Sequence, residues 1–260
     1  MNLNQDWMWM LGRTLMYGRD VSPRGQKIRE LDQVTLQVDM LRPVITNPLR
    51  KLNYRFMMAE ALWMCSGRND LSSLVRYNPN MARFSDDGAV LAGAYGPRIM
   101  DQLGYVLNKL LEDRDTRQAT MTLWQPNPPS SKDIPCTIAM DFKIRDNQLN
   151  MHVFMRSSDL WLGIPYDVFS FSMVATMITG MLNIHGMGLR PGTLFLTAAS
   201  SHLYETHWET AKQIIDGPHF EPCRSMQKEF YTEEWLTTTL ILAQDSKKGD
   251  KVRWWEHDQN

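Results

Sequence analysis

An alternating segment near the middle of the chain constrains the fold more than any other feature. Residues 136–157, CTIAMDFKIRDNQLNMHVFMRS, alternate apolar and polar side chains on both sides of Asp146-Asn147. Period-two alternation is typical of strands with one buried face, and an Asp-Asn pair suits a tight turn, so the segment predicts a β-hairpin. The side chains expected to face inward are Ile138, Met140, Phe142, Ile144, Leu149, Met151, Val153 and Met155.

Helical and strand-like patterns flank the hairpin. Apolar side chains at helical spacing predict helices over residues 3–17, 53–67, 101–113, 168–183 and near 205–215. Strand patterns cover residues 34–41, 119–124, 193–204 and 237–244, and proline and glycine mark 21–31 as a basic loop. No linker or internal repeat interrupts the pattern. We therefore expect one domain over residues 1–260, an α/β (α+β) fold with an antiparallel-rich sheet packed on helices.

Composition excludes several protein classes. The 28 Lys and Arg nearly balance the 29 Asp and Glu, so bulk charge gives no reason to expect a nucleic-acid partner. The three cysteines lack metal-ligand spacing, which predicts no metal site and a reducing compartment. No signal-peptide pattern occurs, and no uninterrupted apolar run reaches the roughly 18 residues of a membrane span. We expect a cytoplasmic protein with no membrane partner.

Residues 155–171, MRSSDLWLGIPYDVFSF, place polar groups in a segment that otherwise has the composition of a core. Buried polar groups need partners, so they either cap secondary structure or surround a polar ligand. Asp167 precedes an apolar helical run and is suited to be a plain N-cap. In the same way, His202 and Tyr204 in SHLY fit a strand end with a satisfied histidine. Both interpretations stay open for these residues.

Glu60 lies among apolar neighbours at helical spacing, which are Phe56, Met57, Trp63 and Met64. A carboxyl group on such a face is desolvated, and desolvation raises its pKa toward the range useful to a general acid or base. The alternative is a glutamate at the rim of the helix that reaches solvent or pairs with an arginine.

Cys136 follows Pro135 at the start of the first hairpin strand. Most free cysteines are small buried hydrophobic residues, and that interpretation is available here. A nucleophilic cysteine instead needs a cation close to its thiolate. The hairpin brings Arg156 back beside Cys136, which supplies the cation.

Arg24, Arg117 and Arg156, with Ser157, offer donors that match a phosphate group. The three arginines are scattered along the chain, and surface arginines are common, so the signal is weak by itself. The sequence contains no GxGxxG motif and no Walker loop, which leaves a dinucleotide or ATP-type cradle unsupported.

Taken in order, six separated motifs resemble the thymidylate synthase superfamily. They are AEALWMCSG with Glu60, GAYG with Tyr95, DTRQ with Arg117, PCT with Cys136, then RSSDLWLGIPYD and SHLY. Their order and spacing match the family from about residue 20 to about residue 215. The resemblance implies a homodimer formed through the sheet. It also implies transfer of a one-carbon unit from 5,10-methylenetetrahydrofolate to carbon 5 of a pyrimidine nucleotide.

The resemblance implies a role for each nucleotide-side residue. Cys136 would attack carbon 6 of the base. Arg156 would lower the pKa of Cys136 and hold the phosphate, with Ser157 and Arg24 beside it. Arg117 would reach the phosphate bound by the partner subunit.

Further roles follow for the base, the folate and the sugar. Glu60 would order water and manage protons on the base and the folate. Tyr95 would border the thiol and the proton abstraction at carbon 5. Asp159 and Gly163 would lie on the folate side. The sugar hydroxyl would be held by His202 and Tyr204.

Asp167 departs from the family pattern. Thymidylate synthases carry an asparagine there, which pairs with N3–H and O4 of uracil, whereas cytosine offers an acceptor at N3 and a donor at its amino group. A carboxyl group can accept from that amino group and share a proton with N3. An ionised carboxylate facing O4 of uracil leaves polar groups unpaired, at about 1–3 kcal/mol. We expect dCMP as the substrate.

Other departures resemble those of the phage deoxycytidylate hydroxymethylases, which would place the protein in a host cytoplasm. Thr137 replaces a histidine after the cysteine, Met155 replaces a glutamine, and SSHLY replaces DTHLY. Gln118 stands where the family has a second phosphate-binding arginine, and Met81 and Phe84 replace tryptophans on the folate side.

The fate of the transferred carbon depends on water. A synthase closes a small apolar C-terminal tail over its site and excludes water, whereas this sequence ends in DSKKGDKVRWWEHDQN. We therefore expect addition of water and a deoxycytidylate 5-hydroxymethyltransferase. A dCMP methylase, a thymidylate synthase acting on dUMP, and a non-catalytic nucleotide-binding homologue are the alternatives.

Overall fold

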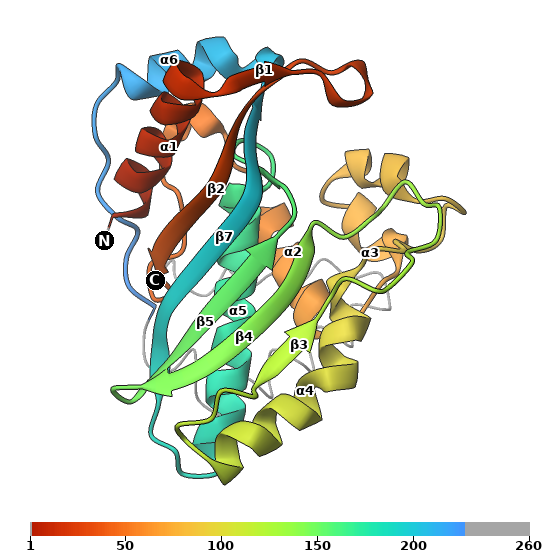
Figure 1. The fold of residues 1–260 in the computed structure, drawn as a ribbon, viewed down its shortest axis with the longest axis vertical. Helices are drawn as coiled ribbons and strands as arrows, with labels where there is room; N and C mark the ends of the chain where they lie inside the picture. The colour runs from red at the N-terminus through yellow and green to blue at the C-terminus, as the bar shows by residue number, and fades with distance from the viewer. Residues whose placement is uncertain (1, 227–260) are drawn as a thin grey trace, which may run out of the picture.

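The structure, a computed structural model, describes residues 2–226 (Figure 1). The helices are α1 (Leu3–Tyr17), α2 (Tyr54–Cys65), α3 (Leu71–Val75), α4 (Tyr95–Glu112), α5 (Ile164–Ile184) and α6 (Trp208–Ile215). Single 3-10 turns are η1 (Pro23–Gly25), η2 (Pro48–Arg50), η3 (Pro79–Phe84) and η4 (Glu205–His207). The strands are β1 (Arg19–Val21), β2 (Ile28–Asp39), β3 (Thr120–Thr122), β4 (Thr137–Arg145), β5 (Gln148–Met155), β6 (Ser158–Asp159) and β7 (Arg190–Tyr204).

One sheet organises the fold. Its strand order is β1-β2-β7-β5-β4-β3, with β6 joined to β7. The pairings are antiparallel except for β5 with β7 and β6 with β7, which confirms the predicted α/β class with an antiparallel-rich sheet. Figure 1 shows α2 and α5 behind the sheet, α1 beside α6 at one end, and α4 beside β3.

The predicted hairpin is β4 and β5. Asp146 and Asn147 both have positive φ, 52° and 56°, as the tight turn requires. The inward side chains of β5 are buried as predicted, but Ile138 on β4 is 40% exposed. The register shifts between Thr137 and Ala139, and a bulge of this kind turns the side chain to the other face. The prediction that Ile138 faces inward is therefore wrong.

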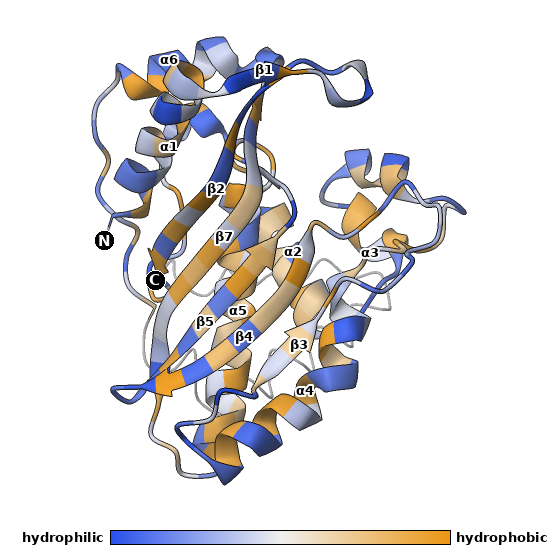
Figure 2. Ribbon diagram, viewed as in Figure 1, coloured by the Kyte–Doolittle hydropathy of each residue, from blue (hydrophilic) through white to orange (hydrophobic). Residues whose placement is uncertain are grey.

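α5 is the central helix of the core. Its length and composition would allow a membrane crossing, but 78% of its most apolar stretch is buried inside the protein, and Figure 2 shows it among other hydrophobic elements. It begins at Ile164. Pro165 therefore lies in the first turn, where a proline is tolerated because its missing N–H has no partner within the helix. Gly163 is the N-cap, so Asp167 lies inside the helix and the plain N-cap interpretation is wrong.

Two further element boundaries differ from the sequence pattern. α4 begins at Tyr95, with Pro97 in its first turn, so the helix starts before the predicted residue 101. β2 begins at Ile28, before the predicted residue 34. Gln33 has φ 51° and interrupts the alternation of apolar and polar side chains, so the sequence pattern did not reveal the first half of the strand. The predicted strand over 237–244 lies outside the described residues.

Candidate active site

Cys136 and Arg156 lie side by side at the open end of the β4–β5 hairpin. The backbone N–H of Arg156 donates to the Cys136 carbonyl at 2.8 Å, which continues the strand pairing. The guanidinium donates from Nε to the Pro135 carbonyl at 2.9 Å and from Nη2 to the Ile134 carbonyl at 3.1 Å. Nη2 also lies 3.7 Å from Cys136 Sγ. The predicted proximity of cation and thiol is confirmed.

Burial is the largest influence on the Cys136 thiol and raises its pKa above the ordinary value. Arg156 and a hydrogen bond with Ser157 oppose that shift, whereas Asp167 and Asp133 add to it. Arg156 thus acts in the direction expected, but the net shift of the pKa is upward. A reaction that uses Cys136 as nucleophile therefore needs a base or a bound ligand to draw off the thiol proton.

Tyr95 opens α4 and lies next to the cysteine. Its hydroxyl accepts the backbone N–H of Thr137, the residue after Cys136, at 3.2 Å. Its ring stacks on Phe171 of α5, with centroids 6.3 Å apart. Burial, followed by the charges of Asp167 and Cys136, raises the pKa of Tyr95. The phenol stays protonated and can donate a hydrogen bond beside the thiol.

Glu60 on α2 and Asp167 on α5 are carboxyl groups on two helices that pack together. Burial, with the charge of Asp167, raises the pKa of Glu60 to about 8, which confirms the upward shift predicted from its apolar neighbours. Burial, with the charge of Asp159, raises the pKa of Asp167 to about 7. Neither group takes part in an ion pair within the described part of the chain. Both can change protonation state near neutral pH.

A tight turn leads from β6 into α5 and holds two acidic residues. The side chain of Asp159 accepts the backbone N–H groups of Trp161 and Leu162 at 2.7 and 3.0 Å. Gly163 allows a close approach here, because a Cβ on it would lie 3.0 Å from the Asp159 carbonyl and 3.1 Å from Asp167 Oδ2. The turn therefore fixes Asp159 and Asp167 relative to each other.

His202 lies on β7, where its register partner is Asp159 on β6. Its side chain is 8% exposed, and Nδ1 has no hydrogen-bond partner among the described residues. The ring meets Tyr204 edge to face, with centroids 5.4 Å apart. Burial lowers the pKa of His202, opposed by Asp159 and Glu30. The interpretation of His202 as a satisfied strand-end histidine does not fit a buried ring nitrogen without a partner.

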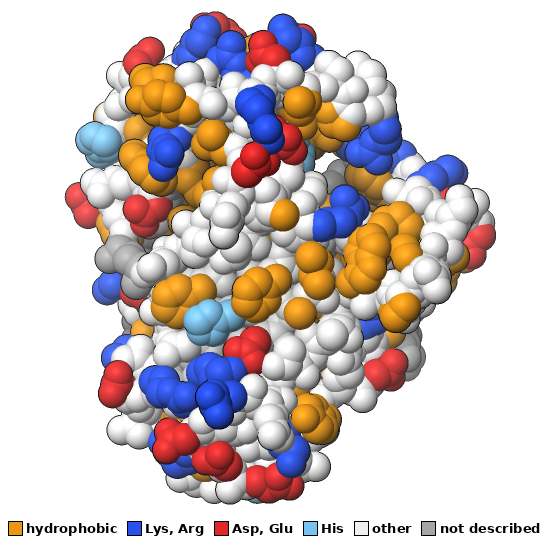
Figure 3. Space-filling view, viewed as in Figure 1, with side chains coloured by type: hydrophobic (Ala, Val, Ile, Leu, Met, Phe, Trp, Pro, Cys, Tyr) orange, Lys and Arg blue, Asp and Glu red, His pale blue; other side chains and the backbone are white. Residues whose placement is uncertain are grey.

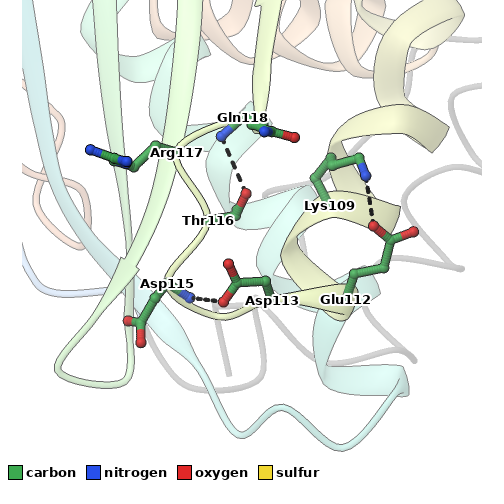
Figure 4. A pocket seen from close by; sticks show the side chains of 7 residues that line it. All are labelled: Lys109, Glu112, Asp113, Asp115, Thr116, Arg117 and Gln118. Atoms are coloured by element: carbon green, nitrogen blue, oxygen red, sulfur yellow. Dashed lines mark hydrogen bonds and ion pairs between the residues drawn. The ribbon is translucent and has the colours of Figure 1, made fainter.

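The other two predicted phosphate residues lie away from the thiol within one chain. Arg24 is exposed, on the β1–β2 loop that Figure 1 shows projecting on the side of α3. Since Thr120 on β3 pairs with Asp141 on β4, Arg117 lies toward the end of β4 opposite Cys136. It lines a pocket of about 720 Å³ (Figure 4). The pocket residues are Lys109, Glu112, Asp113, Asp115, Thr116, Arg117 and Gln118.

The site also contains residues that the sequence patterns did not single out. Asp133 accepts the backbone N–H of Gly93 at 2.7 Å and influences the thiol through its charge. The ring of Trp124 lies 5.8 Å from the guanidinium carbon of Arg156. Both belong to the irregular segment before β4, which has no periodicity to assign a face. Met81 and Phe84 pack against a small cluster that also contacts Tyr166.

Comparison with known proteins gives a consistent family assignment. Residues 7–234 match the thymidylate synthase family. The deoxyuridylate hydroxymethyltransferase of Bacillus phage SP01 is 31% identical over 221 residues, which is 77% of this chain and 56% of that protein. The protein of the same name in Pseudomonas phage M6 is 32% identical over 166 residues, 60% of this chain and 46% of its own.

An archaeal protein adds to the comparison. A putative thymidylate synthase of Methanococcoides burtonii is 32% identical over 130 residues, 47% of this chain and 58% of its own. The chain thus spans about half the length of the curated relatives that it matches. The family match itself extends over most of the described fold, including every candidate residue from Arg24 to Tyr204. The chain belongs to the thymidylate synthase family.

Proposed function

We propose that this chain transfers a one-carbon unit from 5,10-methylenetetrahydrofolate to carbon 5 of dCMP and gives 5-hydroxymethyl-dCMP. The observation that carries the proposal is the placement of Cys136 Sγ 3.7 Å from the Arg156 guanidinium, with the Tyr95 hydroxyl bonded to the backbone N–H of the next residue, Thr137. The ionisable pair Glu60 and Asp167 lies on the helices behind them.

The chemistry assigns a task to each of these groups. Cys136 adds to carbon 6 of the pyrimidine, which makes carbon 5 nucleophilic, and the thiol proton leaves to a base. Carbon 5 then bonds to the one-carbon unit that the folate supplies, and it loses its own proton near Tyr95. Glu60, with its pKa of about 8, can hold and release a proton on the base and on the folate. Expulsion of Cys136 restores the aromatic ring.

Asp167 supports cytosine as the base. A neutral carboxyl group donates its O–H to N3 of cytosine and accepts a hydrogen from the 4-amino group. Burial and the charge of Asp159 raise the pKa of Asp167 to about 7, so this donor is available near neutral pH. An aspartate at this place distinguishes the chain from the asparagine of the synthases it resembles.

Deoxyuridylate is the second candidate substrate. Two phage relatives carry the name deoxyuridylate hydroxymethyltransferase, at 31% and 32% identity. A neutral carboxyl group can also turn its O–H toward O4 of uracil and accept from N3–H. The two bases therefore have to be distinguished by experiment.

The same relatives support a hydroxymethyl product, which forms when water adds to the exocyclic methylene group. Hydroxymethylation regenerates tetrahydrofolate, whereas methylation consumes a hydride from the folate and leaves dihydrofolate. The C-terminal sequence from which water access was predicted lies outside the described residues.

We further propose that two copies of the chain complete each site. Arg117 lies near the far end of β4 from Cys136, so it would serve the phosphate bound by a partner subunit. Ile138 on β4 and Phe154 on β5 are 40% and 45% exposed. Figure 3 shows a band of hydrophobic side chains across the face of the molecule on which the sheet lies open. An apolar sheet face of this kind is suited to an interface between subunits.

The remaining assignments are those that the family resemblance implies. Arg24, Arg156 and Ser157 would bind the nucleotide phosphate, and His202 with Tyr204 would bind the sugar hydroxyl. Asp159 and Gly163, which lie in the turn that leads to Asp167, would contact the folate.

Mass spectrometry of the nucleotide product tests the proposal. The protein is incubated with methylenetetrahydrofolate and either dCMP or dUMP, and absorbance near 340 nm reports any dihydrofolate. We expect hydroxymethyl-dCMP without dihydrofolate. Methyl-dCMP with dihydrofolate would retain the base and reject the water step. Product from dUMP alone would reject the role given to Asp167.

A further inference from the structure

Arg50 is a buried cation at a place that the proposed mechanism does not use. It ends the short η2 turn, and its side chain is 7% exposed. No ion pair joins it to a carboxylate within the described residues, although Asp159 influences it through its charge. Burying a guanidinium is costly, so its retention calls for a geometric reason.

Within the described part of the chain, the side-chain contacts of Arg50 reach residues 159–166, the turn that runs from β6 into the start of α5. Nε donates to the Trp161 carbonyl at 2.8 Å. The guanidinium carbon lies 5.2 Å from the centre of the Trp161 ring and 5.7 Å from that of Tyr166. A planar, five-donor group can contact both rings and the carbonyl at once, whereas the compact ammonium group of a lysine can keep only part of these contacts.

The two rings are anchored from other elements as well. Trp161 stacks on His207 with centroids 5.0 Å apart and meets Trp7 of α1 at 5.8 Å. The Tyr166 hydroxyl accepts the backbone N–H of Asn53 at 3.1 Å. Arg50 is the group that touches both rings, and so it joins the two ends of the turn.

Asp159 begins this turn and Asp167 directly follows Tyr166. The backbone N–H of Gly163 donates to the Asp159 carbonyl at 3.1 Å, and that of Asp167 donates to the Gly163 carbonyl at 2.9 Å. A shift of either ring would therefore be passed through two hydrogen bonds to the carboxyl groups.

We propose that Arg50 is a positioning residue, whose guanidinium holds Trp161 and Tyr166 so that Asp159 and Asp167 keep their places on the folate and base sides of one turn. The inference rests on the proposed function for its catalytic consequence. Its structural part, the restraint of the turn, can be measured without any turnover.

The experiment compares R50M and R50K with R13M. Arg13 is a matched control, because its guanidinium carbon also lies between two rings, 4.9 Å from Trp9 and 6.0 Å from Tyr17, but on the exposed side of α1. For each variant, hydrogen exchange of peptides covering 159–167, kcat and KM for both substrates, nucleotide affinity and the pH profile of kcat are measured.

In R50M we expect faster exchange confined to 159–167 and a fall in kcat of about 10- to 100-fold, since small misplacements of catalytic groups cost rates of this order. Nucleotide affinity should fall by a smaller factor than kcat, because the phosphate and sugar contacts lie outside the turn and only the base contact of Asp167 is disturbed. The pH profile should shift, R50K should lie between R50M and wild type, and R13M should match wild type.

One outcome would overturn the proposal. In it, R50M loses activity only in proportion to the fraction of unfolded protein, and both its pH profile and its hydrogen exchange over 159–167 stay as in wild type. If the wild-type protein turns over neither nucleotide, the proposed function fails instead. The exchange measurement then still decides whether Arg50 restrains the turn.

Discussion

The guanidinium of Arg156 approaches the thiol of Cys136 to 3.7 Å while two carbonyls of the preceding segment, those of Ile134 and Pro135, hold it in place. The cation is thus positioned by the backbone that leads to the nucleophile. Burial nevertheless keeps the pKa of Cys136 above the ordinary thiol value. Arg156 therefore moderates the pKa of the thiol but does not by itself produce a thiolate near neutral pH.

Replacing Arg156 by glutamine should raise the pKa of Cys136 further, because a positive charge that lowers it is removed. The measurement is the rate of alkylation by iodoacetamide as a function of pH. Both proteins carry serine in place of Cys65 and Cys223, so that Cys136 is the thiol that reacts. Arg145→Gln, at the other end of β4, is the control and should leave the profile unchanged. An identical profile in both variants would remove the electrostatic role of Arg156.

Glu60 and Asp167 should make folding stability depend on pH. Burial raises their pKa values to about 8 and about 7, above those of an unfolded chain. Their contribution to stability is therefore complete below about pH 4 and is lost as pH rises through 7 and 8. E60Q and D167N should each be more stable than wild type by about 1–3 kcal/mol at pH 8.5, and less so at pH 6.

Urea unfolding at several pH values tests this prediction, with D20N as the control. Asp20 is exposed and paired with Arg29, so its replacement should change stability by less than about 1 kcal/mol at every pH. If the stability of D167N relative to wild type does not grow with pH, Asp167 ionises in the folded protein with no loss of folding free energy.

The preference for dCMP over dUMP should increase with pH. N3 of cytosine is basic, so the carboxyl of Asp167 and this base keep their shared proton to a higher pH than Asp167 and uracil do. Competition between the two nucleotides, followed by product mass spectrometry from about pH 6 to about pH 8.5, measures the ratio. D167N should flatten the pH dependence and favour dUMP. A constant ratio in the wild-type protein would show that other groups select the base.

The hairpin and the thiol–guanidinium pair could be predicted from sequence because both follow from local rules. Alternation, a positive-φ turn and antiparallel pairing together fix which residues meet at the open end, and Arg156 meets Cys136 there. The upward shift of the Glu60 pKa was predictable for a similar reason, since helical spacing identifies its apolar neighbours.

Other features depend on contacts that no local pattern contains. The bulge at Thr137–Ala139 reverses Ile138, and a proline in the first turn places Asp167 within α5. Arg50 looks like one more basic residue in a loop, yet it is buried against Trp161, a ring that Trp7 of α1 and His207 of η4 also contact. Burial of a polar residue by distant segments leaves no periodic signal.

Subunit complementation tests the proposed role of Arg117 across a dimer. C136A should abolish turnover, and R117A should weaken it by removing a phosphate contact from the partner's site. When the two variants are mixed and allowed to exchange subunits, each mixed dimer regains one site that has both residues. Statistical exchange should then restore about one quarter of wild-type activity. Mixing C136A with R145A, a variant with its own Cys136, should give only the activity of the R145A subunits. No gain from the R117A mixture would mean that Arg117 acts within its own chain or not at all.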